Sequence, residues 1–246
     1  MKSAVPALLC LLALTACTDR EAELKAQQAA QAQHREQAAD ELARNYEKAR
    51  ADGQWQAAFL HGNALLKNYA GTAAAARVEP TFAEVRARAE AKREADRLSS
   101  LWSYVQVPVA PAKGSKGGTQ YSAMIDSKTG VDVDGRGERT VQLVFRDHPA
   151  WKRSSYLVLQ AGDFAKACYA GCKVEVTGDD GKAIALKAWR PKTDEAIAMF
   201  IEDDKRLWKL ARANKALRVA FRTRDTGTKT AVFETGGVLP ERMPGW

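Results

Sequence analysis

Few side chains in this 246-residue sequence have the type and spacing that catalysis requires. The three histidines, His34, His61 and His148, are far apart in sequence, and no two have the spacing of metal ligands. Asp147 precedes His148 and could orient its imidazole for general-base chemistry, but no serine or cysteine nucleophile motif accompanies the pair. We therefore expect His148 to be a solvated turn residue. The alternative is a cell-envelope hydrolase, which predicts a cleft that joins His148 to Asp147 or Glu138.

Two acidic segments have structural interpretations. Asp132-Val133-Asp134-Gly135 begins like a calcium-binding loop, but Leu143 occupies the twelfth position, where such a loop has a glutamate. We interpret this segment as a turn. Glu202-Asp203-Asp204 is interpreted as the acidic start of a helix, where carboxylates interact favourably with the helix dipole. No glycine-rich phosphate loop is present, so the sequence predicts no catalytic residue, no metal and no cofactor.

The first 16 residues have the features of an export signal. Lys2 provides the positive charge, Val5 to Leu14 the apolar core, and Leu14-Thr15-Ala16 the approach to a cleavage site. The longest apolar run, Ala4 to Ala16, is shorter than the roughly 20 residues that a membrane-spanning helix needs. The segment 1–16 is therefore predicted to be a signal peptide, not a membrane anchor.

The motif Leu14-Thr15-Ala16-Cys17 resembles the lipobox of bacterial lipoprotein precursors. The resemblance implies cleavage before Cys17, attachment of diacylglycerol to its thiol, and labelling by palmitate. Each buried methylene contributes about 0.8 kcal/mol, so two or three acyl chains hold a protein on a membrane. In relatives, an aspartate directly after the cysteine favours retention in the inner membrane. Thr18 is found there instead, so the resemblance implies an outer-membrane location facing the periplasm.

Export leaves one cysteine pair for the folded protein. Cys10 leaves with the signal peptide and Cys17 carries lipid, which leaves Cys168 and Cys172. In an oxidising compartment this pair is expected to form a disulfide, a local cross-link that contributes about 2 kcal/mol in the chain-entropy model. A redox pair has Cys-x-x-Cys spacing, and a zinc site needs two further ligands. Both alternatives are therefore disfavoured.

The net charge of +8 belongs mainly to the C-terminal half. From Thr18 to Ser103, 13 Lys and Arg residues balance 13 Asp and Glu residues, whereas from Tyr104 onward 24 basic residues exceed 17 acidic ones. An exported protein rarely meets nucleic acid. The excess therefore points to anionic lipid, lipopolysaccharide or a peptidoglycan-linked polymer as a partner, or to an unspecialised basic surface.

One cluster of basic residues recurs at helical and near-helical spacing: Lys205, Arg206, Lys209, Arg212, Lys215 and Arg218. The simpler interpretation is a solvated outer helix face. The functional interpretation is an anion-binding face made by Lys205, Arg206, Lys209 and Arg212. The sequence leaves both open.

Residues 17–103 are predicted to form a helical stalk or hairpin. The segment Glu21 to Arg50 is rich in Ala and Gln, which indicates a solvated spacer or a weak coiled coil. Apolar residues from Trp55 to Tyr69 have the three-four spacing of one buried stripe. A third helix is expected from about Thr81, because Pro80 is favoured at a helix start.

One segment resembles part of a tetratricopeptide-type repeat: it runs from Gly53-Gln54-Trp55-Gln56-Ala57-Ala58 through Tyr69-Ala70-Gly71-Thr72. The resemblance covers about half of one repeat, and a stacked superhelix needs three or more. It therefore implies a helical hairpin and not a peptide-binding solenoid.

Residues 104–120 are predicted to be a linker, because Val107 to Thr119 is rich in Pro, Gly, Ser and Lys. Beyond it the apolar period changes to two. Strands are expected at Thr140–Arg146, Ser155–Gln160, Lys173–Thr177, Ala183–Trp189, Leu217–Thr223 and Thr230–Glu234. Gly178-Asp179-Asp180-Gly181 is expected to form a hairpin turn and Asp203–Asn214 a helix. Residues 121–246 are thus predicted to form a small antiparallel β-sandwich-like or curled sheet with one helix, and the chain to be α+β.

Three segments of this region resemble periplasmic domains associated with type VI secretion: Met199-Phe200-Ile201, Leu217-Arg218-Val219-Ala220-Phe221 and Val232-Phe233-Glu234-Thr235-Gly236-Gly237. The resemblance covers about a third of the chain and implies a fold only.

These features predict a non-catalytic outer-membrane lipoprotein. Its basic periplasmic domain is expected to bind an envelope protein or an anionic envelope polymer, with the membrane contacted through the lipid anchor and no nucleic acid bound. Two alternatives stay open: a cell-envelope hydrolase, and a structural subunit of a secretion or assembly complex in which the stalk mediates oligomerisation.

Overall fold

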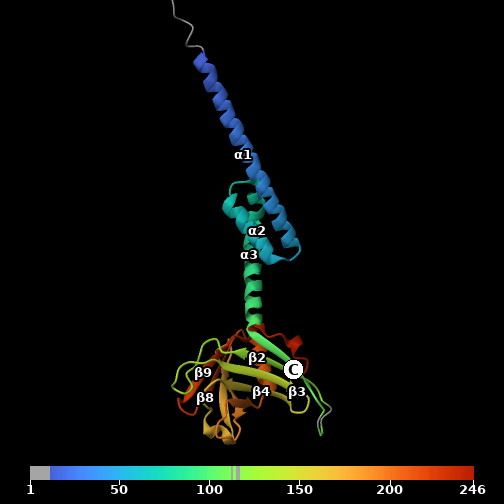
Figure 1. The fold of residues 1–246 in the computed structure, drawn as a ribbon, viewed down its shortest axis with the longest axis vertical. Coiled ribbons are helices and arrows are strands. Elements are labelled where there is room, and N and C mark those ends of the chain that lie inside the picture. Colours follow the sequence, from blue (N-terminus) through green and yellow to red (C-terminus); the bar gives the residue numbers. More distant parts are fainter. Residues whose placement is uncertain (1–11, 112, 115–116) are drawn as a thin grey trace, which may run out of the picture. The chain divides into compact units, whose positions relative to one another are not determined.

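The computed structural model describes residues 12–246 except 112, 115 and 116, with side chains described from Arg20 onward. Most of the expected signal peptide, residues 1–11, lies outside the described residues. Cys17 lies in the backbone of the first helix, but its side chain is outside the described part. The fold is α+β, as the sequence predicts, and divides into one compact unit that ends at Arg93 and a second that spans Glu94–Trp246 (Figure 1).

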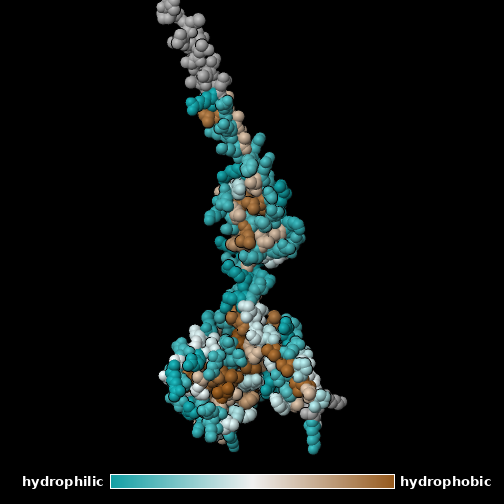
Figure 2. All heavy atoms as spheres, viewed as in Figure 1, coloured by the Kyte–Doolittle hydropathy of each residue, from teal (hydrophilic) through white to brown (hydrophobic). Residues whose placement is uncertain are grey.

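The first unit is built from helices α1 (Leu12–Ala51), α2 (Trp55–Asn68) and the first part of α3 (Ala73–Ser100). Residues 20–35 of α1 are all exposed, and Figure 2 shows mainly hydrophilic residues along this part of the helix. Farther along α1, the buried residues Ala39, Ala43, Tyr46 and Ala49 recur at three-four spacing. The interpretation as a solvated spacer therefore fits the first part of α1, and small side chains pack the second part into a core.

Helix α3 begins earlier than predicted. It starts at Ala73, after Thr72, whose Oγ1 accepts a hydrogen bond from the Ala75 N–H at 3.2 Å and so caps the helix. Pro80 lies inside the helix and not at its start. Tertiary contacts compensate for the backbone hydrogen bond that a proline cannot donate: Val78 and Val85 are buried, and the Thr81 hydroxyl hydrogen-bonds Tyr46 at 2.8 Å.

The second unit contains a nine-stranded antiparallel sheet with the strand order β1-β2-β3-β4-β7-β6-β5-β8-β9. The strands are β1 (Trp102–Val109), β2 (Gly118–Asp126), β3 (Val141–His148), β4 (Lys152–Leu159), β5 (Cys172–Thr177), β6 (Ala183–Trp189), β7 (Ala198–Ile201), β8 (Leu217–Arg222) and β9 (Thr228–Phe233). The predicted hairpin turn at residues 178–181 joins β5 to β6, and the predicted helix is α4 (Asp204–Ala213). Three short 3-10 helices complete the unit: η1 (Lys166–Ala170), η2 (Thr235–Gly237) and η3 (Pro240–Arg242).

The predicted linker at 104–120 is wrong. Its first part lies in β1 and its last part in β2, and the two strands pair over their whole length as a hairpin. Pro108 is compatible with a strand here because β1 is at the edge of the sheet, where a missing N–H leaves no partner unpaired. Among the described residues that suggested a linker, Lys113, Gly114 and Gly117 lie between the two strands.

The sheet is curled around one core. Buried side chains from all nine strands belong to a single hydrophobic cluster that also contains Leu207, Trp208 and Ala211 of α4. The Lys128 N–H, just after β2, donates a hydrogen bond to the Val232 carbonyl of β9 at 2.7 Å. Opposite ends of the sheet therefore approach each other, and the curled sheet is the better description of the two that the sequence allowed.

A group of ion pairs stabilises the region where these parts of the sheet meet. The Glu234 carboxylate accepts hydrogen bonds from Arg97 at 2.9 Å and from Lys128 at 3.2 Å. The Arg97 guanidinium, helped by Lys128, holds the pKa of Glu234 below its usual range. Glu234 thereby ties the end of α3 and the β2–β3 connection to the end of β9.

None of the helices in the described part of the chain is both long enough and apolar enough to cross a membrane.

Replacement of Gly62 by alanine tests the packing of the first unit. A Cβ atom at Gly62 would lie 2.7 Å from the Phe82 ring and 2.9 Å from the Tyr46 ring. We expect Gly62→Ala to lower the free energy of unfolding by about 1–3 kcal/mol, because overpacking forces both rings to shift. Urea unfolding followed by far-UV circular dichroism measures the loss. The neighbouring exposed control, Asn63→Ala, should change stability by less than about 0.5 kcal/mol, and equal effects of the two would contradict this packing.

Candidate functional site

The basic residues predicted to form an anion-binding face lie together on α4. Burial of Leu207, Trp208 and Ala211 in the core fixes the rotation of the helix, so Lys205, Arg206, Lys209 and Arg212 are all exposed. Within the part of the chain that the structure describes, none of the four forms an ion pair with a carboxylate. Lys215 and Arg218 do not continue the face, because Lys215 follows the helix and Arg218 lies in β8.

Helix stability accounts for only part of this charge pattern. Asp203 caps the helix by accepting a hydrogen bond from the Arg206 N–H at 3.2 Å, and Arg212 in the last turn interacts favourably with the helix dipole. Lys205 and Arg206 lie in the first turn, where the dipole disfavours cations. Helix stability therefore does not explain why these two cations lie in the first turn. This favours the interpretation of α4 as an anion-binding face.

The β5–β6 hairpin turn holds the end of α4 in place. Asp179 accepts hydrogen bonds from the backbone N–H groups of Lys215 at 2.7 Å and Ala216 at 3.2 Å. The Asn214 side-chain carbonyl accepts from the Asp179 N–H at 2.8 Å. The basic face is therefore displayed on a helix that is anchored at its buried side and at its C-terminal end.

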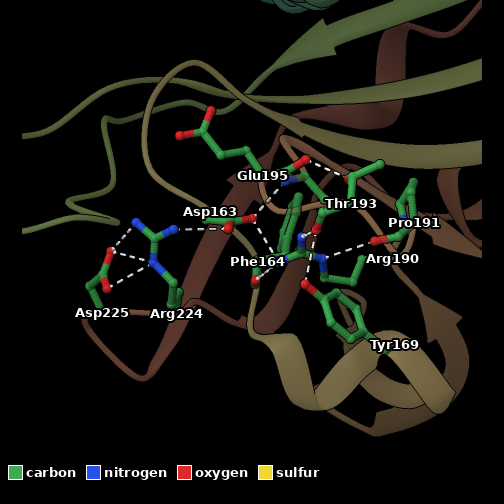
Figure 3. Close-up of polar contacts among 10 residues, drawn as sticks. Asp163, Phe164, Tyr169, Arg190, Pro191, Thr193, Glu195, Arg224 and Asp225 are labelled. Atoms are coloured by element: carbon green, nitrogen blue, oxygen red, sulfur yellow. Dashed lines mark hydrogen bonds and ion pairs between the residues drawn. The ribbon is translucent and has the colours of Figure 1, made fainter.

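A second polar feature, which the sequence interpretation missed, is a buried ion pair between Asp163 and Arg190 (Figure 3). Their side chains are 1% and 0% exposed, and the Arg190 Nη1 to Asp163 Oδ1 distance is 2.8 Å. Arg190 also donates to the carbonyls of Phe164 at 2.7 Å and Thr193 at 2.6 Å. The one sequence signal was Arg190 itself, which continues the inward-facing series of β6 after Leu186 and Ala188.

Further contacts make Asp163 the centre of a network. The carboxylate accepts from the Ala196 N–H at 2.8 Å and from Arg224 Nη1 at 3.0 Å. The ring of Tyr169 lies 4.5 Å from the Arg190 guanidinium carbon, and its hydroxyl donates to the Thr193 carbonyl at 2.9 Å. With these partners each buried charge has a counter-charge and several hydrogen bonds, which offset the cost of its burial.

A pocket of about 470 Å³ lies beside this network and has charged walls that include Asp134, Arg136, Glu195, Arg224 and Asp225. Hydrogen bonding to Arg224 lowers the pKa of Asp225, so this carboxylate is already engaged in an ion pair with Arg224. Across the described residues, no group of three or more His, Cys, Asp or Glu side chains has the geometry of a metal site. The pocket holds intramolecular ion pairs and no nucleophile next to a base.

His148 is not the solvated turn residue that the sequence predicted. It is 6% exposed, its ring stacks on Trp151 at 4.0 Å, and its Nδ1 accepts hydrogen bonds from the Ala150 and Trp151 N–H groups. Asp147 precedes it in β3, so the two side chains point to opposite faces of the sheet. The Asp147–His148 pair of the hydrolase hypothesis is therefore not formed.

Two other sequence predictions concern turns and cysteines. Asp132 and Asp134 accept hydrogen bonds from the N–H groups of Gly135 and Arg136 at 2.7 and 3.0 Å, which is the predicted turn. Cys168 and Cys172 have their sulfur atoms at bonding distance and their Cα atoms 4.9 Å apart, a geometry suited to a disulfide.

Comparisons with known proteins add little. No family model matches the chain, and no curated protein matches it. Among solved structures, the chain is similar to the crystal structure of invasion associated protein b from Bartonella henselae, with 17% sequence identity over 56% of this chain and 85% of that chain. The TM-score of 0.32 is too low to support an argument about fold or function.

The buried ion pair predicts unequal effects of removing two carboxylates that both contact Arg224. We expect Asp163→Ala to lower the free energy of unfolding by about 3–5 kcal/mol, because Arg190 then remains buried without a counter-charge. Asp225→Ala removes an exposed partner and should leave stability nearly unchanged. Chemical unfolding of the two variants measures the difference in the free energy of unfolding. Similar losses in both variants would show that Asp163 does not stabilise the protein by pairing with the buried Arg190.

Proposed function

We propose that this protein is a lipid-anchored lipoprotein of the bacterial envelope whose second unit binds an anionic envelope polymer through α4. The observation that carries the proposal is the set of four exposed cations on one helix, Lys205, Arg206, Lys209 and Arg212, none of which is paired with a described carboxylate. Two of them occupy positions that the helix dipole disfavours. The lipobox-like motif that ends at Cys17 supports the location.

An anionic polymer fits this surface better than a small anion. The four cationic groups are spread along eight residues of helix, and they line separate surface hollows: Arg206 lines one, and Lys209 and Arg212 line another. Exposed charges gain little from any single contact in water, and a ligand with repeated charges engages several at once. Attraction of this kind is screened by salt over about 10 Å at 0.1 M ionic strength.

The lipid anchor predicts a specific fate for Cys17. In cells fed radiolabelled palmitate, the wild-type protein should carry label and fractionate with the outer membrane, because acyl chains on Cys17 partition into the bilayer. The Cys17→Ser variant should lose both the label and the membrane fractionation. An unlabelled wild-type protein, or a Cys17→Ser variant that still fractionates with membranes, would refute the anchor.

Binding to inorganic polyphosphate, a polyanion without sugar or lipid, tests the α4 face. We expect the full-length protein in detergent to bind it, and the fourfold variant Lys205→Gln, Arg206→Gln, Lys209→Gln, Arg212→Gln to lose about tenfold or more in affinity with a weaker salt dependence. Fluorescence anisotropy of labelled polyphosphate measures both.

A matched control removes four other exposed cations of the same unit: Lys166→Gln, Lys182→Gln, Lys192→Gln and Arg222→Gln. This control lowers the net charge equally and should keep affinity within about threefold. Equal losses in the two variants would mean that net charge alone, and not α4, attracts the polymer.

A further inference from the structure

The outer face of the curled sheet carries a row of aromatic side chains. Tyr156 in β4 pairs with Phe200 in β7, which pairs with Trp189 in β6. The ring centroids are 5.2 Å apart in the first pair and 4.7 Å in the second. Their chain neighbours Leu157, Ile201 and Ala188 are buried in the core, so the rings point away from it.

Trp189 is held on one side and open on the other. Phe200 stacks against it at an interplanar angle of 16°. On the β5 side, the antiparallel register that pairs Cys172 with Ala188 brings Gly171 level with Trp189. A Cβ atom at Gly171 would have the Ala188 carbonyl, at 4.0 Å, as its one described neighbour within 4 Å outside residues 170–172, so the space over Gly171 is open. The indole is 38% exposed and already ordered, so a ligand that packs on it loses little side-chain entropy.

Two lysines lie directly opposite each other beside this open side. Lys173 in β5 pairs with Lys187 in β6, both are exposed, and Lys187 is on the same face as Trp189. Like charges opposite each other on neighbouring strands are destabilising. Within the described residues, neither lysine forms an ion pair that offsets the repulsion.

The lysines line a surface hollow of about 420 Å³ together with Gly171, Cys172, Ala188 and Glu202. Glu202 donates its backbone N–H to the Lys187 carbonyl, and its carboxylate is not in ion-pair contact with either described lysine. The hollow therefore contains two lysines without a described ion pair and the carboxylate-bearing Glu202, and Trp189 follows its lining residue Ala188 in β6.

The aromatic row continues in the other direction to a second exposed tryptophan. The Arg146 guanidinium carbon lies 5.3 Å from the Tyr156 ring centroid and 5.3 Å from that of Trp151. Trp151 is 68% exposed and is ordered by its stacking on His148. Each end of the row thus has an exposed indole that a neighbouring ring holds in place.

We propose that this outer face binds an acidic polysaccharide, with one acidic sugar in the hollow beside Trp189. The C–H face of the sugar ring packs on the open indole, because the face of an aromatic ring is electronegative and attracts C–H groups. The carboxylate of the sugar lies between Lys173 and Lys187 and relieves their repulsion. The chain extends past Phe200 and Tyr156 towards Arg146 and Trp151.

Charge and shape both favour this ligand over the alternatives. A neutral polysaccharide leaves the lysine pair unpaired, and a polyphosphate has no ring to pack on the indole. A lipid surface favours apolar side chains that protrude, whereas Phe200 and Tyr156 are packed between neighbours on the sheet. The site shares no residue with the α4 face and does not depend on the lipid anchor.

The test measures binding of polygalacturonate and neutral dextran to full-length protein in detergent that carries the four α4 substitutions, so that α4 does not bind the acidic polymer. Binding of polyphosphate is measured on protein with α4 intact. We expect polygalacturonate to bind at least about tenfold more tightly than dextran, because only the acidic polymer pairs with the lysines. Trp189→Ala should weaken polygalacturonate binding about tenfold or more and leave polyphosphate binding unchanged, whereas Trp189→Phe, which keeps a ring, should lose less than about threefold.

Two further variants complete the test. The double variant Lys173→Gln, Lys187→Gln should lose polygalacturonate binding while its melting temperature stays equal to or rises above that of the wild type, because the repulsion is gone. The control Ile197→Ala removes a 52% exposed apolar side chain outside the row and should bind as the wild type does. Dextran that binds as tightly as polygalacturonate, or a Trp189→Ala variant that binds polygalacturonate normally, would overturn the proposal. Failure of wild-type polyphosphate binding would instead count only against α4.

Discussion

The curvature of the nine-stranded sheet around α4 is the constraint from which the surfaces of the second unit follow. Leu207 and Trp208 of the helix lie in the same core as the inner side chains of every strand, and the Phe145 ring contacts Trp208 at 4.9 Å. Once that side of the helix is buried, its basic residues face solvent. Because successive side chains of a strand point to opposite faces of the sheet, the residues between the buried ones point outward. The α4 cations and the aromatic row are therefore two consequences of one packing arrangement.

The buried charges of this arrangement have hydrogen-bond partners, whereas the buried indole N–H groups of Trp102, Trp208 and Trp246 have none among the described residues. Arg190 directly follows β6 and points inward, where an apolar residue would be expected, and its guanidinium donates hydrogen bonds to Asp163 and to several backbone carbonyls. The groups that it exposes are not compensated in the same way. Lys173 and Lys187 face each other without a described counter-charge. This contrast between a buried arginine with a counter-charge and surface lysines without a described ion pair is the physical basis for placing ligand binding on the outside of the sheet.

Local sequence patterns were sufficient to predict part of the fold. The α+β class, the β5–β6 hairpin and α4 follow from patterns within a few residues of one another. The errors have local causes as well. A composition rich in Pro, Gly, Ser and Lys suggested a linker where β1 and β2 pair. Pro80 suggested a helix start, although α3 continues through this position and Thr81 hydrogen-bonds Tyr46. In α1, alanines that looked like part of a solvated spacer form a buried seam, because a small side chain gives a weak hydrophobic signal and yet allows close packing.

The sequence by itself determined the elements that depend on neighbours along the chain: the period-two strands, the amphipathic α4 with its four basic residues, and the close cysteine pair at 168 and 172. Only the tertiary structure decided which distant residues meet. Asp163, in the loop after β4, contacts Arg190, just after β6, across 27 positions. Strand register pairs Trp189 with Phe200 and brings it level with Gly171. Register is set by burial of one sheet face as a whole, a property that no short segment of the sequence contains.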